Sequence, residues 1–73
     1  ARKIIISCRE LQYISSAGIR ALYILRRELQ PSQGKVVLSE PDPTVRNILD
    51  IVDFSSEIRI LASFEEALEF FRD

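Results

Sequence analysis

The stretch KIIISCRELQYISSAGIRALYILRREL, residues 3–29, joins a short apolar run to a longer segment with helical periodicity. The run KIIISC, residues 3–8, is rich in β-branched side chains, which favour a strand. Within residues 16–29, three leucines spaced at i, i+3 and i+7 share one face of a helix: Leu22, Leu25 and Leu29. The stretch therefore predicts a strand over 3–8 and an amphipathic helix over 16–29.

The rest of the chain repeats this pattern twice. KVVLSE (35–40) precedes PTVRNILDIV (43–52), and EIRILA (57–62) precedes FEEALEFFR (64–72). Strands that alternate with helices of this length predict βαβ crossovers and a parallel sheet. The first two strands have the continuous apolar runs typical of interior strands, whereas the third alternates as expected near an edge. We predict an α/β fold with three βα units, a parallel sheet and amphipathic helices packed on it.

Polar residues and prolines mark the predicted helix boundaries. One of the two serines Ser15 and Ser16 is expected to be the N-cap of the first helix, which Pro31 and Gly34 then end. The second helix has an N-cap followed by a proline, and the third has the two residues of a capping box: Asp42 and Pro43, then Ser63 and Glu66. Helical spacing predicts these residues on the buried faces: Val45, Ile48, Leu49 and Val52, then Phe64, Ala67, Leu68 and Phe71.

Length and composition indicate a single globular domain. The chain has 73 residues, of which 47% are hydrophobic and 29% charged, with a net charge of -1. This charge argues against general affinity for nucleic acid, which needs a basic surface. No apolar run is long enough to span a bilayer, so we expect no direct membrane insertion. The one cysteine, and the absence of a signal-peptide pattern, favour a reducing compartment, and we expect the cytoplasm.

The chain lacks the residues on which most classes of enzyme depend. The chain has no histidine and only two glycines, far apart, which excludes histidine-based catalysis, histidine metal sites and the glycine-rich phosphate loops. Four carboxylates could be imagined around a magnesium ion, but their positions are better explained by a solvated helix face and a loop. They are Asp42, Asp50, Asp53 and Glu57. Cys8 is expected to be a small buried side chain. We therefore predict no enzyme, no cofactor and no metal.

The first predicted strand has no partner on one side. Only two residues precede it, yet its sequence is apolar on both faces. An unpaired strand edge favours pairing with another chain. Either an N-terminal piece is missing or a partner supplies the neighbour.

The start of the first helix is the best candidate for a functional site. A helix N-terminus offers unpaired N–H donors and a positive dipole, so a phosphate on a serine is tolerated there, although capping alone also explains the serines. Gly18 would keep the first turn slim. Four residues share the face of Ser16, and arginine and tyrosine around an aliphatic side chain are typical of an interface centre, with ordinary surface arginines as the alternative: Arg20, Tyr23, Ile24 and Arg27.

The whole chain resembles the STAS domain, best known in bacterial anti-sigma factor antagonists. The resemblance rests on YISSAGIRALYILRREL, then KVVLSEPDPTVRNILDIVDF, then EIRILASFEEAL. In that family an aromatic residue, an aliphatic residue, aspartate, serine, a small hydroxyl residue and glycine precede the helix. Tyr13 and Ile14 match the first two positions, Ser15 stands where aspartate is common, and Ser16 is at the phosphoacceptor position. Ala17 replaces the small hydroxyl residue, Gly18 is the glycine, and Asp53 and Phe54 replace a glycine and a leucine.

The resemblance implies a STAS-like (SpoIIAA-like) fold and a phosphorylation switch. Members of the family bind an anti-sigma factor that is a serine kinase, are turned off when it phosphorylates them, and are restored by a PP2C-type phosphatase. The implied contact residues are Ser15, Ser16, Ala17, Gly18, Arg20, Tyr23, Ile24 and Arg27.

The family also implies a different kind of function and an explanation for the first strand. STAS modules are similar to docking subunits and cytoplasmic tails of transporter systems, which is the alternative function. A full STAS domain has two further strands before the first one here. Residues 1–73 would then be a single STAS domain that is incomplete at its N-terminus, and a homodimer through the first strand is another way to complete the sheet.

Overall fold

Strands and helices alternate along the chain, as the sequence predicts. The computed structural model describes residues 2–72. Its elements are β1 (Lys3–Ser7), α1 (Ser16–Leu29), the 3₁₀ helix η1 (Gln30–Ser32), β2 (Lys35–Ser39), α2 (Pro43–Ile51), the 3₁₀ helix η2 (Phe54–Ser56), β3 (Ile60–Leu61) and α3 (Phe64–Phe71). The strands form one parallel sheet in the order β1-β2-β3. The predicted α/β fold is confirmed.

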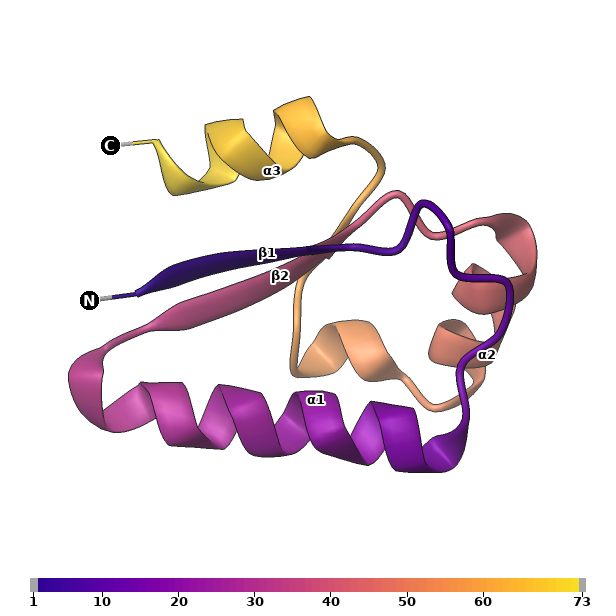
Figure 1. The fold of residues 1–73 in the computed structure, drawn as a ribbon, viewed down its shortest axis with the longest axis horizontal. Coiled ribbons are helices and arrows are strands. Elements are labelled where there is room, and N and C mark those ends of the chain that lie inside the picture. Colours follow the sequence, from indigo (N-terminus) through magenta and orange to yellow (C-terminus); the bar gives the residue numbers. More distant parts are fainter. Residues whose placement is uncertain (1, 73) are drawn as a thin grey trace.

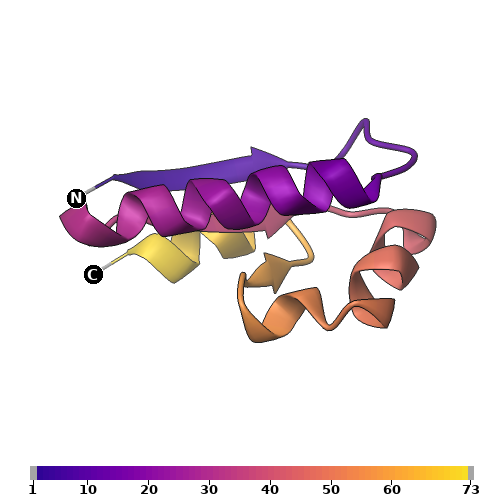
Figure 2. The ribbon, with the colours of Figure 1, turned by 90° about the horizontal axis from the view of Figure 1, so that it is seen from below.

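The helices lie on both faces of the sheet. α1 runs along one face and α3 lies on the other, while α2 lies beyond the carboxyl end of β2 (Figures 1 and 2). The core lies where β2 meets the helices, and its best-buried side chains have no exposed surface: Leu38, Val45, Leu49, Phe54 and Ala67. Within residues 2–72 no helix combines the length and the apolar character needed to cross a membrane.

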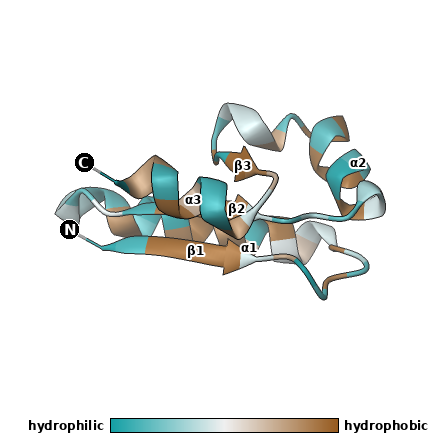
Figure 3. Ribbon diagram, turned by 90° about the horizontal axis from the view of Figure 1, so that it is seen from above, coloured by the Kyte–Doolittle hydropathy of each residue, from teal (hydrophilic) through white to brown (hydrophobic). Residues whose placement is uncertain are grey.

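β1 is an edge strand of the sheet formed by residues 2–72. It pairs with β2 alone, from Lys3 opposite Lys35 to Ser7 opposite Ser39. Its three isoleucines, Ile4–Ile6, are only half-buried, and in Figure 3 most of β1 has the colour of hydrophobic residues. The apolar sequence of β1 is typical of an interior strand, but in the described chain β1 lies at the edge of the sheet. Its outer edge is unpaired, as the sequence analysis expected.

β3 is much shorter than the predicted strand over 57–62. Only Ile60 and Leu61 pair with β2. The preceding residues form a tight turn instead, because the N–H groups of Glu57 and Ile58 both donate to the carbonyl oxygen of Phe54, at 3.0 Å each. This turn buries the Ile58 side chain, which is 1% exposed. The alternating apolar residues of this segment are therefore buried partly by a turn, at Ile58, and partly by a strand, at Ile60.

The predicted helix caps are present. The Val45 N–H donates to Asp42 Oδ1 at 2.8 Å, with Pro43 next in sequence, and the Glu66 N–H donates to Ser63 Oγ at 3.1 Å. These hydrogen bonds satisfy donors that a helix start leaves free. The predicted starts of α2 and α3 are confirmed.

The end of α1 needs glycine for close approach. The Gly34 N–H donates to the Leu29 carbonyl oxygen at 2.8 Å, and the left-handed residue of the turn is Gln33, with φ of 61°. A Cβ on Gly34 would lie 3.1 Å from Leu29 Cβ and 3.2 Å from the Arg2 carbonyl oxygen. Gly34 thus lets the chain pass tightly between α1 and β1.

Three residues predicted on buried helix faces are exposed. Val52 is 46% exposed because α2 ends at Ile51 and helical spacing no longer applies. Phe64 and Leu68 are 43% and 51% exposed, although Ala67 between them is buried. The described sheet has only three strands, one of them two residues long, and it is too narrow to cover both flanks of the apolar stripe of α3.

Candidate functional site

The two serines at the start of α1 have different positions. Ser15 is the N-cap: it has extended backbone angles, and its Oγ accepts a hydrogen bond from the Gly18 N–H at 3.1 Å. Ser16 is the first helical residue and is exposed. Capping therefore explains Ser15 and leaves the hydroxyl of Ser16 at the positive end of the helix dipole, facing solvent.

Gly18 serves internal packing. It is half-buried, and a Cβ there would lie 3.2 Å from Cγ1 of Ile14, whose side chain is 8% exposed. The missing side chain makes room for Ile14 beneath the helix, next to the loop that carries Ser15 and Ser16. The expectation that Gly18 keeps the first turn slim toward a partner stays a prediction.

Five of the predicted site residues meet in one groove on α1. The groove has a volume of about 510 Å³ and is lined by Ser16, Ile19, Arg20, Tyr23, Ile24 and Arg27. Ile24 is 44% exposed, and the two arginines on either side of it are exposed as well. The arrangement is an aliphatic centre with cationic flanks, in the groove that Ser16 lines at the start of α1.

The remaining three predicted residues lie elsewhere. Ser15 and Gly18 line a different hollow of about 370 Å³, which lies between α1 and β1 and also includes Cys8. Ala17 is exposed and lines neither hollow. The sequence analysis missed Ile19, which belongs to the groove although its side chain is 8% exposed. Its position three residues after Ser16 is the signal that was available.

Tyr23 is held in place by the core. Its ring stacks on that of Phe54, with the ring centres 5.3 Å apart and the planes 24° from parallel. Phe54 has no exposed surface, and it comes from η2, far along the sequence. Because one face of the tyrosine ring rests on a fixed partner, the middle of the groove is pre-organised for contact.

The groove continues toward α2. A neighbouring hollow of about 450 Å³ shares Tyr23 and Arg27 and is completed by residues from the end of α1 and from the segment after α2: Arg26, Gln30, Val52, Asp53, Ser56 and Glu57. An ion pair of 3.3 Å joins Arg26 to Glu57 across it. Sequence reasoning missed this second half because only the packing of η2 against α1 brings the two segments together.

Three of the four carboxylates considered for a magnesium site have separate structural roles. Asp42 caps α2, Asp50 pairs with Arg46 at 3.1 Å, and Glu57 pairs with Arg26. Asp53 has a φ of 54°, in the left-handed region. Among residues 2–72 no three side chains of histidine, cysteine, aspartate or glutamate lie close enough together to hold a metal ion.

Cys8 is a buried side chain, as the sequence predicts. It is 2% exposed and packs in the hydrophobic core. Desolvation by burial raises the pKa of its thiol above the ordinary value of 9.0. The thiol is therefore neutral at physiological pH and is a poor nucleophile.

Comparison with known proteins identifies the family. The family model of the STAS domain matches residues 1–67. The chain belongs to the STAS domain family. This family is one of regulatory binding modules and not of enzymes. The predicted resemblance is confirmed.

Named relatives of this STAS chain include bacterial proteins. It is 35% identical over 71 residues to "Putative anti-sigma factor antagonist BtrV" of Bordetella bronchiseptica, covering 97% of this chain and 61% of that protein. Its fold is similar to the crystal structure of "a putative anti-sigma factor antagonist (tm1081)" from Thermotoga maritima, with a TM-score of 0.88 and 19% identity over 94% of this chain and 59% of that one. The fold is also similar to the NMR structure of TM1081, with a TM-score of 0.82 and 21% sequence identity. This match covers 92% of this chain and 54% of that one. The chain thus spans about 60% of the length of these relatives.

Proposed function

We propose that this STAS chain is an anti-sigma factor antagonist that binds an anti-sigma factor with serine kinase activity, in the bacterial cytoplasm, and is switched off by phosphorylation of Ser16. A PP2C-type phosphatase would reverse the modification. The observation that carries the proposal is the position of Ser16: it is exposed at the start of α1, in the same groove as Arg20, Tyr23 and Ile24. The relative named as an anti-sigma factor antagonist supports the partner class.

The physical basis of the switch is the cost of placing charge in a packed contact. A phosphate adds about 1.5 to 2 negative charges near neutral pH. At Ser16 these charges would lie at one end of the groove that also holds Ile24, where a bound partner excludes water, so the dianion must be desolvated or repelled. Because Ser15 already provides the cap, modification of Ser16 leaves the N-cap hydrogen bond intact. Binding would weaken while the domain stays folded.

Phosphorylation by the cognate kinase tests the proposal. After incubation with that anti-sigma kinase and ATP, mass spectrometry should find one phosphate, on Ser16. Ser16→Ala should abolish the modification, whereas Ser15→Ala should retain it as the matched control. A protein that stays unmodified, or that carries the phosphate elsewhere, contradicts the proposed site.

The effect of charge is measured separately from the modification. Ser16→Asp should weaken the complex with the anti-sigma factor far more than Ser16→Ala, because only the aspartate adds charge to the groove. Isothermal titration calorimetry gives both affinities. Equal affinities for the two variants would show that the switch is not electrostatic.

We further propose that a neighbour extends the sheet beside β1, either chain that precedes residue 1 in a longer STAS domain or the β1 strand of a second copy. The half-buried isoleucines Ile4–Ile6 at the edge support this, since an unpaired apolar edge favours strand pairing. Analytical ultracentrifugation distinguishes the two arrangements: a concentration-dependent dimer that Ile5→Lys disrupts supports the second copy, and a monomer at all concentrations excludes it.

A further inference from the structure

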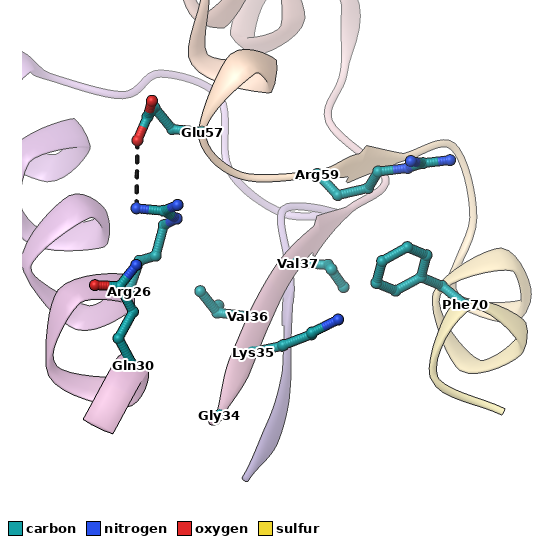
Figure 4. Close-up of a pocket in the computed structure, with 9 residues that line it drawn as sticks. All are labelled: Arg26, Gln30, Gly34, Lys35, Val36, Val37, Glu57, Arg59 and Phe70. Atoms are coloured by element: carbon teal, nitrogen blue, oxygen red, sulfur yellow. Dashed lines mark ion pairs between the residues drawn. The ribbon is translucent and has the colours of Figure 1, made fainter. Parts of the chain in front are cut away.

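The edge of β2 that faces β3 is open over part of its length. β3 pairs only with Leu38 and Ser39, so within the described chain no strand lies beside Lys35–Val37 on this side. A cavity of about 330 Å³, here called the notch, lies along this part of the edge (Figure 4). Its lining comes from α1, β2, the segment around β3, and α3. The notch therefore lies where β3 is too short to pair with β2, between the helix α1 on one face of the sheet and α3 on the other.

The backbone of Val36 is directed into the notch. In a parallel sheet each residue points its N–H and C=O toward one neighbouring strand, and successive residues alternate. The Lys35 N–H donates to the Arg2 carbonyl oxygen on the β1 side at 2.8 Å, and the Leu38 N–H donates to the Arg59 carbonyl oxygen on the β3 side at 3.0 Å. Val36 alternates with Leu38, so its N–H and C=O face the β3 side, where an extended chain has room to pair with them.

The side of the notch near α3 is cationic. Figure 4 shows Val36 pointing toward α1, and Lys35 and Val37 pointing to the opposite face, where Arg59 and Phe70 lie. The Arg59 guanidinium carbon lies 5.2 Å from the centre of the Phe70 ring, which orients this cation above an aromatic wall. Two positive side chains thus share one face of the notch.

The side near α1 is close to neutral. Arg26 pairs with Glu57 at 3.3 Å, and Gln30, the first residue of η1, is the next side chain on this side of the notch. The whole lining contains three cations and one carboxylate, although the chain has a net charge of -1. The positive charge that remains after this ion pair is that of Lys35 and Arg59, and it favours an acidic occupant.

We propose that the notch binds an extended acidic peptide segment of a partner protein by antiparallel strand addition to β2. One peptide residue exchanges both backbone hydrogen bonds with Val36, as in an antiparallel hydrogen-bonded pair. The side chain of that residue faces α1, beside Val36 and Gln30. The residues before and after it face α3, because strand side chains alternate. Two carboxylates spaced by i, i+2 then reach Lys35 and Arg59.

This site is distinct from the part of the proposed kinase-binding groove around Ser16. None of Ser16, Arg20 or Ile24 lines the notch. The notch shares Arg26, Gln30 and Glu57 with the hollow into which the groove continues. The two proposals can therefore fail independently.

A designed peptide tests the notch. The probe is Ac-Thr-Glu-Val-Glu-Ser-NH2, added to the ¹⁵N-labelled full chain and followed by amide chemical shifts and hydrogen exchange. We expect saturable shifts at Lys35, Val36 and Arg59, slower exchange of the Val36 amide, and unchanged amides around Ser16. The isomer Ac-Thr-Glu-Glu-Val-Ser-NH2 has the same composition and charge but adjacent carboxylates, and it should bind more weakly.

Two further changes separate backbone pairing from charge attraction. N-methylation of the peptide valine removes the donor for the Val36 carbonyl and should abolish binding. Lys35→Glu and Arg59→Glu should each raise Kd by about two- to fivefold, as for exposed ion pairs, while their amide spectra stay those of the folded chain. The proposal is overturned if no shift appears at Val36, if the isomer or the N-methylated peptide binds equally well, or if the charge reversals leave Kd unchanged.

Discussion

Ser15 and Ser16 are adjacent, yet the structure predicts opposite consequences for replacing them with alanine. Ser15→Ala removes the Oγ that accepts the Gly18 N–H at 3.1 Å, and the first turn of α1 has no acidic residue to compensate. Loss of such an N-cap costs about 1 kcal/mol. Ser16→Ala removes an exposed hydroxyl outside the cap and should change the free energy of unfolding by less than about 0.5 kcal/mol.

The loss at Ser15 is large enough to measure. A chain of this size is expected to have a free energy of unfolding of roughly 4–11 kcal/mol. A loss of 1 kcal/mol lowers the Tm of such a small domain by about 4–8 °C. Thermal and urea unfolding followed by circular dichroism at 222 nm therefore resolves the Ser15→Ala variant from the native chain.

Matched variants make the test specific to capping. Ser63→Ala removes the corresponding cap from α3, whose Glu66 N–H also lies 3.1 Å from the serine Oγ. It should destabilise the fold less than Ser15→Ala does, because Glu65 and Glu66 in the first turn of α3 still stabilise the helix N-terminus. Ser15→Asp should retain the stability, because aspartate is an equally good N-cap. The assignment of roles is refuted if Ser16→Ala destabilises as much as Ser15→Ala, or if Ser15→Asp fails to restore the cap.

Three further outcomes are expected. Ile24→Asp should weaken binding of the anti-sigma factor at least about tenfold, as for a central interface residue, whereas Ile51→Asp, at a position 82% exposed and outside the groove, should not; similar affinities by calorimetry would exclude the α1 groove. Asp53→Gly should stabilise the fold by about 0.5–1 kcal/mol, because the left-handed backbone at φ of 54° costs an aspartate more than a glycine. A lower urea midpoint would contradict this. Because burial raises the pKa of Cys8 above 9.0, the neutral thiol is favoured in the fold; its stabilising effect is complete below about pH 9 and is lost as pH rises through the folded pKa. Between pH 8 and about pH 10, the free energy of unfolding of Cys8→Ala should therefore fall less than that of the native chain. Identical pH dependence of the two free energies would contradict this explanation.

The local features of the chain follow from its sequence. Asp42 and Ser63 cap helices because their side chains reach backbone donors three residues ahead, a geometry set within one turn. Ser16 and Arg20 share a face because they are four residues apart on one helix. The sequence could therefore predict both the helix starts and most of the groove on α1.

Other features depend on segments that are far apart in the chain. The contact of Tyr23 with Phe54 and the ion pair of Arg26 with Glu57 require η2 to pack against α1, and no local pattern encodes that distance. The shortness of β3 was also not predictable, because a turn at Phe54 and a strand bury the same alternating isoleucines.

The sequence by itself determined where helices begin, which residues share a helix face, and that strands and helices alternate into a parallel sheet, because these depend on interactions over a few residues. Only the tertiary structure decided that Tyr23 stacks on Phe54, that Arg26 pairs with Glu57, and that β2 keeps an open edge at Val36. These depend on how elements with distant sequence positions pack together, and that packing is settled by shape and burial across the whole core.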